Sequence, residues 1–292
     1  MFDGAFTALV TPFANGKVDF RTLGKLIESQ IDAGISGLVP CGTTGESATL
    51  TEQECKDVIR ATVESAGKRV PVIAGTGSNN TRETVERTAF AKEFGADAAL
   101  LVTPYYNKPT PQGLFEHYRT VASEVDIPII LYNVPARTGI SLPVETVAAL
   151  SEIPNIVAIK EASGNLAYVS EIIEACRITV LSGEDSLTLP ILALGARGVI
   201  SVVSNVLPRQ TEELVRSYLN GKTEEAREIH FQMLPLMRAL FVETNPAPVK
   251  EAMAYLGLIE PEIRLPLVRV SEKSRRVIID ALKKCNLCDK ER

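Results

Sequence analysis

Three segments of the chain place reactive or hydrogen-bonding side chains directly after runs of apolar residues. Lys160 ends one such run, Tyr132 lies near the end of another, and residues 42–46 (Gly-Thr-Thr-Gly-Glu) follow a third. A lysine amine can attack a carbonyl carbon and form an imine, and this chemistry needs a second group that carries protons. Lys160 thus has two interpretations at this point. Its spacing alone favours a lysine at a strand edge whose amine extends into water. The other interpretation is an imine-forming nucleophile with Tyr132 as its proton carrier.

Two further groups suit the binding of small carboxylic acids. Gly42 and Gly45 let the backbone approach an anion closely, and the hydroxyls of Thr43 and Thr44 could hold a carboxylate. Arg137 offers a planar fork of donors for a second carboxylate. The alternatives are an ordinary polar loop for the first group and a solvated surface arginine for the second.

The sequence gives little support for a dinucleotide, phosphate or metal site. Residues 75–77 (Gly-Thr-Gly) lack the third glycine of a dinucleotide-binding loop, and no lysine of the phosphate-loop kind is present. Cys285 and Cys288 have a metal-like spacing, but a zinc site needs a second pair of ligands. His117 and His230, the two histidines, lie far from that pair in the sequence. We therefore expect no metal site.

Composition excludes several classes of partner. The chain has 292 residues, and 31 Lys and Arg against 36 Asp and Glu give a net charge of −5, which disfavours nucleic acid binding. No apolar run approaches the roughly 18 residues that span a bilayer. The first residues lack the positive charge of a signal peptide, and five cysteines, an odd number, favour a reducing compartment. We expect a cytoplasmic protein that binds neither nucleic acid nor membranes.

Eight apolar runs alternate with amphipathic stretches of helical period, which predicts repeated strand–helix units. Thr51 and Glu54 form the signature of a helix capping box. The predicted strands are 5–10, 37–41, 70–74, 98–102, 127–133, 156–160, 178–182 and 199–204. In the predicted strand 156–160, side chains alternate between the two faces, so Lys160 is expected to share one face with Ile156 and Ala158.

These units predict an α/β fold, a (β/α)8 TIM barrel over residues 1–221 with a C-terminal helical appendage over residues 222–292. The appendage is expected to contain helices at 223–240, 247–256 and 272–285. The rival architecture is an open, doubly wound sheet. In a barrel, functional side chains gather where the strands end, so Lys160, Tyr132 and the 42–46 loop would face one cavity.

Longer segments around these residues carry a resemblance that covers the chain to about residue 282. The segments are 4–13, 42–47, 105–109, 132–139 and 159–164. Through them the sequence strongly resembles the dihydrodipicolinate synthase family of pyruvate-dependent, Schiff-base-forming aldolases, a group of lyases that includes N-acetylneuraminate lyase. The resemblance implies condensation of pyruvate with L-aspartate 4-semialdehyde to 4-hydroxy-tetrahydrodipicolinate, in diaminopimelate and lysine biosynthesis. It implies no metal and no organic cofactor.

The resemblance also implies catalytic roles. Lys160 resembles the lysine that condenses with the keto group of pyruvate, and Tyr132 resembles the tyrosine that moves protons to and from the imine. Thr43 and Tyr106 resemble its relay partners, with Tyr106 reaching in from a neighbouring subunit. Another pyruvate aldolase, of the sugar-acid or sialic acid type, is an alternative. So is a ligand-binding barrel without catalysis.

Four further positions resemble substrate-binding residues of the family. Thr44 resembles the residue that holds the carboxylate of pyruvate, and Arg137 the arginine that grips the carboxylate of the semialdehyde. Gly183 and Ile200 resemble residues that line the pocket. Because both substrates are anions and the chain is acidic overall, Lys160 and Arg137 would have to hold them by local positive charge.

The resemblance extends to assembly and regulation. It implies a homotetramer, a dimer of dimers. It also implies a feedback site for L-lysine near the subunit interface, in which Glu52 and Cys55 stand where enteric enzymes often have histidine, so inhibition is left open. The positions that match this site are Ser47, Ala48, Glu52, Cys55, Asn79, Glu83 and Tyr105.

Overall fold

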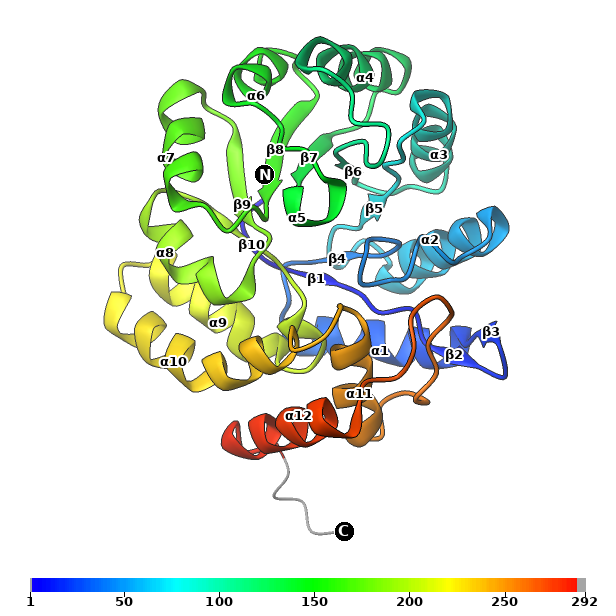
Figure 1. The fold of residues 1–292 in the computed structure, drawn as a ribbon, viewed down its shortest axis with the longest axis vertical. Helices are drawn as coiled ribbons and strands as arrows, with labels where there is room; N and C mark the ends of the chain where they lie inside the picture. Colours follow the sequence, from blue (N-terminus) through cyan, green and yellow to red (C-terminus); the bar gives the residue numbers. More distant parts are fainter. Residues whose placement is uncertain (1, 288–292) are drawn as a thin grey trace.

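The computed structural model describes residues 2–287, so Cys288 of the terminal cysteine pair lies outside the described residues. Eight parallel strands form one sheet around which the helices are arranged (Figure 1). The strands are β1 (Gly4–Ala8), β4 (Gly37–Val39), β5 (Ile73–Gly75), β6 (Ala98–Val102), β7 (Ile129–Asn133), β8 (Ile156–Glu161), β9 (Thr179–Ser182) and β10 (Gly198–Ser201). Each overlaps one of the predicted strands.

The sheet is closed rather than open. Its strand order begins at β4 and ends at β5, and backbone hydrogen bonds join these two strands. The Leu38 N–H donates to the Pro71 carbonyl over 3.0 Å, and the Gly75 N–H donates to the Pro40 carbonyl over 2.9 Å. This closure confirms the barrel and rejects the doubly wound sheet.

A helix follows each strand of the barrel. These helices are α1 (Phe20–Asp32), α2 (Glu52–Ala66), α3 (Thr81–Glu93), α4 (Pro111–Glu124), α6 (Val144–Ser151), α7 (Leu166–Ala175), α8 (Thr188–Ala193) and α9 (Pro208–Leu219). Side chains cap several N-termini, and the predicted capping box of Thr51 and Glu54 is present at the start of α2. A short helix, α5 (Pro135–Thr138), lies between β7 and α6.

A β-bulge in β8 corrects one prediction about the neighbours of Lys160. Ile129 of β7 pairs with Ile156, but the next residue, Ile130, pairs with Ala158. The extra residue in β8 turns Ile156 outward into the core between strands and helices. Ala158 packs inside the barrel, so Lys160 shares its inward face with Ala158 and not with Ile156.

Two apolar layers hold the barrel together. One lies between strands and helices and includes Leu38, Ile129 and Ile159. The other fills the barrel interior and includes Phe6 and Ile200, so the interior is a packed core rather than a pore. Alternation of side chains along each strand separates the two layers.

The remaining elements lie outside this repeating pattern. The antiparallel hairpin of β2 (Phe13–Ala14) and β3 (Lys17–Val18) follows β1 and was not predicted.

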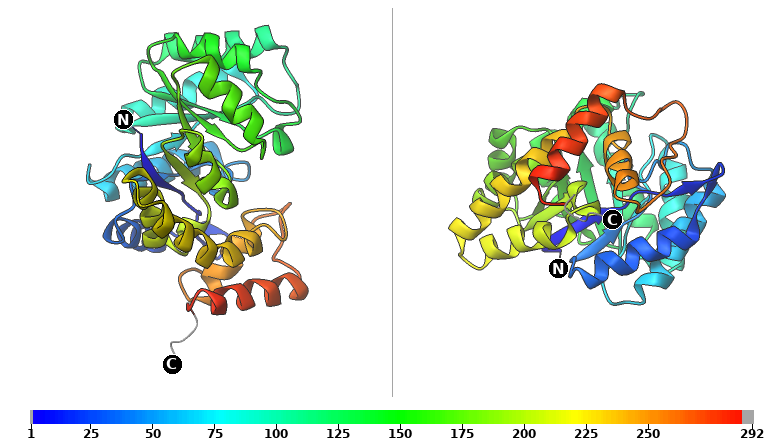
Figure 2. Two further views of the ribbon diagram at one scale, coloured as in Figure 1. Left: turned by 90° about the vertical axis from the view of Figure 1, so that its left-hand side faces the viewer. Right: turned by 90° about the horizontal axis from the view of Figure 1, so that it is seen from below.

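Three helices follow α9 close to their predicted ranges, and Figures 1 and 2 show them together on the side of α1 and α9. They are α10 (Thr223–Ala239), α11 (Ala247–Tyr255) and α12 (Glu272–Lys284). Within residues 2–287 no helix has the length and apolar character needed to cross a membrane.

Candidate active site

A cavity of about 740 Å³ lies where the barrel strands end. Tyr132 of β7 and Lys160 of β8 contribute to its wall. Gly183, directly after β9, and Val202, directly after β10, also line it, as does the 42–44 segment after β4. The cavity therefore lies at the carboxyl ends of the strands, where barrel enzymes carry their catalytic groups.

Lys160 and Tyr132 are neighbours on adjacent strands. The two residues are register partners in the β7–β8 pair, and the Lys160 Nζ lies 4.3 Å from the centre of the Tyr132 ring. Both side chains are buried, at 7% exposure each. A buried amine and a phenol hydroxyl thus share one cavity, as an imine-forming lysine and its proton carrier require.

Gly183 leaves the space that the Lys160 side chain occupies. A Cβ atom at this position would lie 2.9 Å from Lys160 Cε and 2.7 Å from Ala162 Cβ. The Gly183 N–H donates to the Glu161 carbonyl over 2.7 Å, which fixes the glycine beside the end of β8. A larger residue would therefore press directly on the lysine.

The loop with Thr43 and Thr44 is a tight turn. The Gly45 N–H donates to the Gly42 carbonyl and the Glu46 N–H to the Thr43 carbonyl, each over 3.1 Å. A Cβ at position 45 would lie 3.1 Å from the Leu9 carbonyl, so only glycine fits there without displacement. The turn presents both threonines to the cavity.

A buried ion pair between Glu46 of this turn and Lys250 of α11 holds the turn in place. Glu46 accepts a hydrogen bond from Lys250 Nζ over 2.5 Å, and both side chains are at most 3% exposed. Lys250 Nζ also donates to the Thr11 carbonyl and lies over the Phe13 ring. Burial lowers the pKa of Lys250, and the Glu46 carboxylate acts in the opposite direction.

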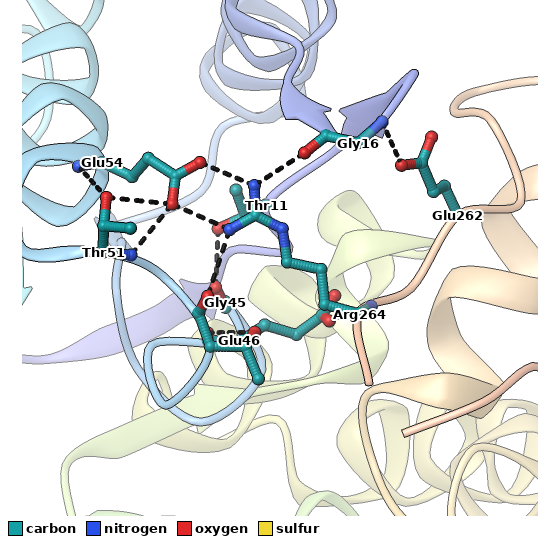
Figure 3. Close-up of polar contacts among 9 residues, drawn as sticks. Thr11, Gly16, Gly45, Glu46, Thr51, Glu54, Glu262 and Arg264 are labelled. Atoms are coloured by element: carbon teal, nitrogen blue, oxygen red, sulfur yellow. Dashed lines mark hydrogen bonds and ion pairs between the residues drawn. The ribbon is translucent and has the colours of Figure 1, made fainter. Parts of the chain in front are cut away.

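Arg264 extends the same anchor to helix α2, as Figure 3 shows. Its backbone N–H donates to Glu46, and its guanidinium donates to both carboxylate oxygens of Glu54 over 2.6 and 2.8 Å. The same guanidinium reaches the Gly16 carbonyl over 3.0 Å. This bidentate pair lowers the pKa of Glu54 to about 2. The segment before α12 therefore fixes the position of the threonine loop.

Asn245 is a cavity residue that the sequence analysis missed. Its Nδ2 donates to the Thr44 Oγ1 over 3.0 Å, and its main-chain carbonyl accepts from Arg137 Nη2 over 3.1 Å. Its Oδ1 is buried and has no hydrogen-bond partner among residues 2–287. The segment between α10 and α11 carries it, and only its position before Pro246 sets it apart in the sequence. Asn245 thus contacts two predicted carboxylate-binding residues.

The other predicted residues lie at different depths. Arg137 is exposed at the cavity wall and keeps donors free for a ligand. Ile200 lies one layer deeper, inside the barrel core, and Val202 forms the cavity wall above it. Tyr106 does not reach the cavity within its own chain, because its side chain is 89% exposed on the loop after β6. Its φ of 73° lies in the left-handed region, which few residues other than glycine adopt.

Three carboxyl groups lie next to the lysine. Glu161 accepts from Asn133 Nδ2 over 2.8 Å, and Asp185 accepts from the Val202 and Val203 N–H groups over 3.0 and 2.8 Å. Glu184 lines the cavity itself. Burial raises the pKa of all three groups, and the Lys160 amine opposes this rise for Glu184 and Asp185. Glu184 and Asp185 therefore lie close enough to Lys160 for its charge to act on them, although no ion pair joins them to it among residues 2–287.

Five of the seven residues of the expected regulatory site line two adjoining cavities. Ser47, Ala48 and Tyr105 line a cavity of about 590 Å³ that shares Arg137 with the active-site cavity. Ser47, Glu52 and Cys55 line a smaller one of about 20 Å³. Asn79 Nδ2 donates to the Tyr105 carbonyl over 3.1 Å, and Glu83 forms an ion pair with Arg87. The seven residues therefore lie near one another.

Metal ligands do not cluster in the described part of the chain. Among residues 2–287, no three His, Cys, Asp or Glu side chains gather in an arrangement that could hold a metal ion.

Known proteins resemble this chain over almost its whole length. Residues 1–285 match the Dihydrodipicolinate synthetase family. A 4-hydroxy-tetrahydrodipicolinate synthase of Nitratidesulfovibrio vulgaris (strain DSM 19637 / Miyazaki F) is 56% identical over 284 residues, which cover 96% of this chain and 97% of that protein. The 4-hydroxy-tetrahydrodipicolinate synthase of Aquifex aeolicus (strain VF5) is 53% identical over 98% of this chain and 99% of its own length.

Solved structures agree with the sequence relatives. The crystal structure of dihydrodipicolinate synthase from Aquifex aeolicus superimposes with a TM-score of 0.96 at 53% identity, over 98% of this chain and 99% of that one. The 4-hydroxy-tetrahydrodipicolinate synthase of Methylacidiphilum fumariolicum SolV superimposes with a TM-score of 0.97 at 46% identity, over 98% and 96% of the two chains. With its barrel, its buried lysine and these relatives, the chain belongs to the dihydrodipicolinate synthetase family.

Proposed function

We propose that the chain is a lyase that condenses pyruvate with L-aspartate 4-semialdehyde to give 4-hydroxy-tetrahydrodipicolinate, a step of diaminopimelate and lysine biosynthesis. The observation that carries the proposal is the buried Lys160 amine beside Tyr132 in the 740 Å³ cavity. Hydroxyl and guanidinium donors for two carboxylates line the same cavity. The names of the relatives support the choice of substrates.

The first half of the reaction uses Lys160 as nucleophile. Its Nζ attacks the keto carbon of pyruvate, water leaves, and an imine forms. The Thr44 hydroxyl and the neighbouring backbone hold the pyruvate carboxylate. Tyr132 takes part in proton transfer to the departing oxygen and from the methyl carbon, whose deprotonation gives an enamine. Thr43 links Tyr132 to the rest of the proton relay.

The second half forms the carbon–carbon bond and the ring. The enamine carbon attacks the aldehyde carbon of the semialdehyde, whose carboxylate Arg137 binds, and the new alkoxide takes up a proton. The amino group of the adduct then attacks the imine carbon and displaces Lys160 Nζ. One molecule of water is lost overall, and the enzyme returns with its free amine.

Trapping of the imine tests this mechanism. Pyruvate with borohydride should reduce the imine and leave a pyruvate-derived adduct on Lys160, which intact mass and peptide mapping would locate. A Lys160→Ala variant should form no adduct and lose synthase turnover. Absence of any adduct on the parent chain would contradict the aldolase mechanism, and turnover of Lys160→Ala at the parent rate would contradict the role of Lys160.

The choice of aldehyde separates this proposal from its closest rival. A sugar-acid or sialic acid aldolase would also form the pyruvate imine but would prefer a sugar aldehyde. Arg137 and the Thr43–Thr44 pair favour a short aldehyde with its own carboxylate. A coupled assay that offers each aldehyde at equal concentration should therefore show turnover with aspartate semialdehyde far above that with sugar aldehydes. A chain that only binds ligands would turn over none.

We also propose that a neighbouring subunit completes the relay with Tyr106 in a homotetramer built from two dimers. The nearly full exposure of Tyr106, away from its own cavity, supports this arrangement. Mixing Lys160→Ala with Tyr106→Phe subunits tests it, because mixed dimers would contain sites with both intact residues. We expect turnover to recover on mixing and the native mass to equal that of four chains. No recovery of turnover would contradict the contribution of Tyr106 to a neighbouring site.

Two broader proposals follow from the same features. Residues 1–221 and 222–292 act as one catalytic unit, because Asn245 and Arg264 of the second segment hold residues of the first. The enzyme works in the cytoplasm, since its described cysteines are free thiols that suit a reducing compartment. Cell fractionation tests the second of these statements.

A further inference from the structure

Two cysteines lie side by side below the threonine loop, where the Cys41 thiol meets the backbone of Cys55. Cys41 lies directly before Gly42, and Cys55 lies in the first turns of α2. The Cys41 Sγ is 3.6 Å from the main-chain carbonyl oxygen of Cys55. Each thiol also has the other as the largest influence on its pKa, so the two side chains lie next to each other.

The two thiols have different surroundings. Cys41 is 2% exposed, and its contact with Cys55 together with burial raises its pKa. Cys55 is half-buried and lines the 20 Å³ cavity beside Arg87. Its contact with Cys41 and the charge of Arg87 lower its pKa. Cys55 is thus the thiol with more thiolate character and an approach from outside.

The small cavity suits a small oxidant. A volume of about 20 Å³ holds about one water-sized molecule. Arg87 and Lys56 line it and supply positive charge near the Cys55 sulfur. Hydrogen peroxide is only slightly larger than water and carries no charge, so it fits better than a bulky thiol reagent.

We propose that Cys55 and Cys41 form a reversible disulfide when the chain meets hydrogen peroxide. The Cys55 thiolate attacks one peroxide oxygen, which gives a sulfenic acid and hydroxide. The Cys41 sulfur then attacks the Cys55 sulfur, and its proton leaves with the departing hydroxide as water. In sum, two thiols are oxidised to one disulfide, and one peroxide is reduced to two molecules of water.

The disulfide should disturb the threonine loop. A disulfide bond is about 2.0 Å long, much shorter than any non-bonded contact between sulfur atoms. The backbone of Cys41 is held tightly, with a φ of 55°, and a Cβ on Gly75 would lie only 2.3 Å from its carbonyl oxygen. Closing the bond therefore shifts the segment that presents Thr43 and Thr44. A displacement of about 1 Å can lower turnover by up to about a hundredfold.

Peroxide treatment of the parent chain tests the proposal without any variant. After stoichiometric peroxide and denaturation, a thiol-alkylating reagent should label three of the five cysteines, and peptide mapping should join the Cys41 and Cys55 peptides. Turnover should fall at least about tenfold in step with the loss of thiols, and dithiothreitol should restore both. These thiol measurements are independent of which aldehyde the enzyme accepts.

Variants assign the order of events. Relative to its own untreated rate, Cys55→Ser should keep its turnover through the treatment. Cys41→Ser should accumulate a Cys55 sulfenic acid that dimedone captures. Cys176→Ser serves as the matched control and should respond like the parent, because Cys176 lies apart, bonded to the Ile172 carbonyl. Five labelled thiols, a bond between other cysteines, or full turnover with the disulfide formed would each overturn the proposal.

Discussion

Asn245 donates a hydrogen bond to the Thr44 hydroxyl over 3.0 Å, although 201 residues separate the two in the chain. The main-chain carbonyl of the same asparagine accepts from Arg137. One residue from outside the strand–helix repeat therefore contacts both groups that we propose as carboxylate binders. The buried Asn245 Oδ1 has no hydrogen-bond partner among residues 2–287, so it can accept a hydrogen bond from a bound substrate.

Replacement of the Asn245 side chain should impair binding of pyruvate. Asn245→Ala frees the Thr44 hydroxyl to rotate and removes one hydrogen bond worth about 1 kcal/mol, so kcat/KM for pyruvate should fall roughly five- to tenfold. Asn245→Asp should fall further, because its charge repels two carboxylates. Asn220→Ala, at an exposed position after α9, is the control. Steady-state kinetics that show no change for Asn245→Ala would contradict this role.

Gly183→Ala should displace the Lys160 side chain from the position in which it attacks pyruvate. The added Cβ would meet Lys160 Cε at 2.9 Å and Ala162 Cβ at 2.7 Å, which forces the nucleophile from its position. We expect the yield of borohydride-trapped pyruvate adduct and the turnover to fall by about tenfold or more. Gly24→Ala is the matched control, because a Cβ there meets nothing within 4 Å. An unchanged adduct yield would show that the lysine tolerates the methyl group.

Sequence periodicity predicted the barrel because its strands are buried on both faces and its helices are amphipathic. It could not predict that Ile156 faces outward. A bulge depends on how two strands pair, so the sequence of a single strand does not reveal it. Lys160 and Tyr132 were found because strand ends carry function in barrels. Asn245 was missed because its role depends on a contact with Thr44 across the whole chain, which no local pattern encodes.

The same limit applies to Lys250, whose partner Glu46 lies 204 residues away in the chain. Lys250→Met should leave the Glu46 carboxylate buried without its partner, at 1% exposure. Loss of one member of a buried pair costs about 3–5 kcal/mol of unfolding free energy, and denaturant titration would measure it. The double variant Lys250→Met/Glu46→Gln should recover part of this loss.

A surface pair provides the comparison for that experiment. Lys222 pairs with Glu225 over 3.2 Å, with the two side chains 64% and 50% exposed. Lys222→Met should change the unfolding free energy by less than about 1 kcal/mol, because water screens the pair. Equal effects for Lys222→Met and Lys250→Met would show that burial does not decide the strength of the Glu46 anchor.

His117 should make stability depend on pH below neutrality. Its imidazole is buried against Tyr118, and its Nδ1 bonds with the Thr81 hydroxyl over 2.9 Å. Burial lowers its pKa from 6.5 to about 4. Between these two values the unfolded chain binds more protons than the folded one, so the contribution of this group to unfolding free energy rises with pH. It is fully present above about pH 6.5 and is lost as the pH falls toward 4.

Comparison of His117→Gln with the parent isolates this contribution from that of other titrating groups. The difference in unfolding free energy between the two should grow by up to about 3 kcal/mol from pH 4 to 6.5 and then stay constant. Thr81→Val keeps the imidazole and should retain the slope of the parent. Parallel curves for the parent and His117→Gln across this range would mean that the imidazole titrates alike in the folded and unfolded chains.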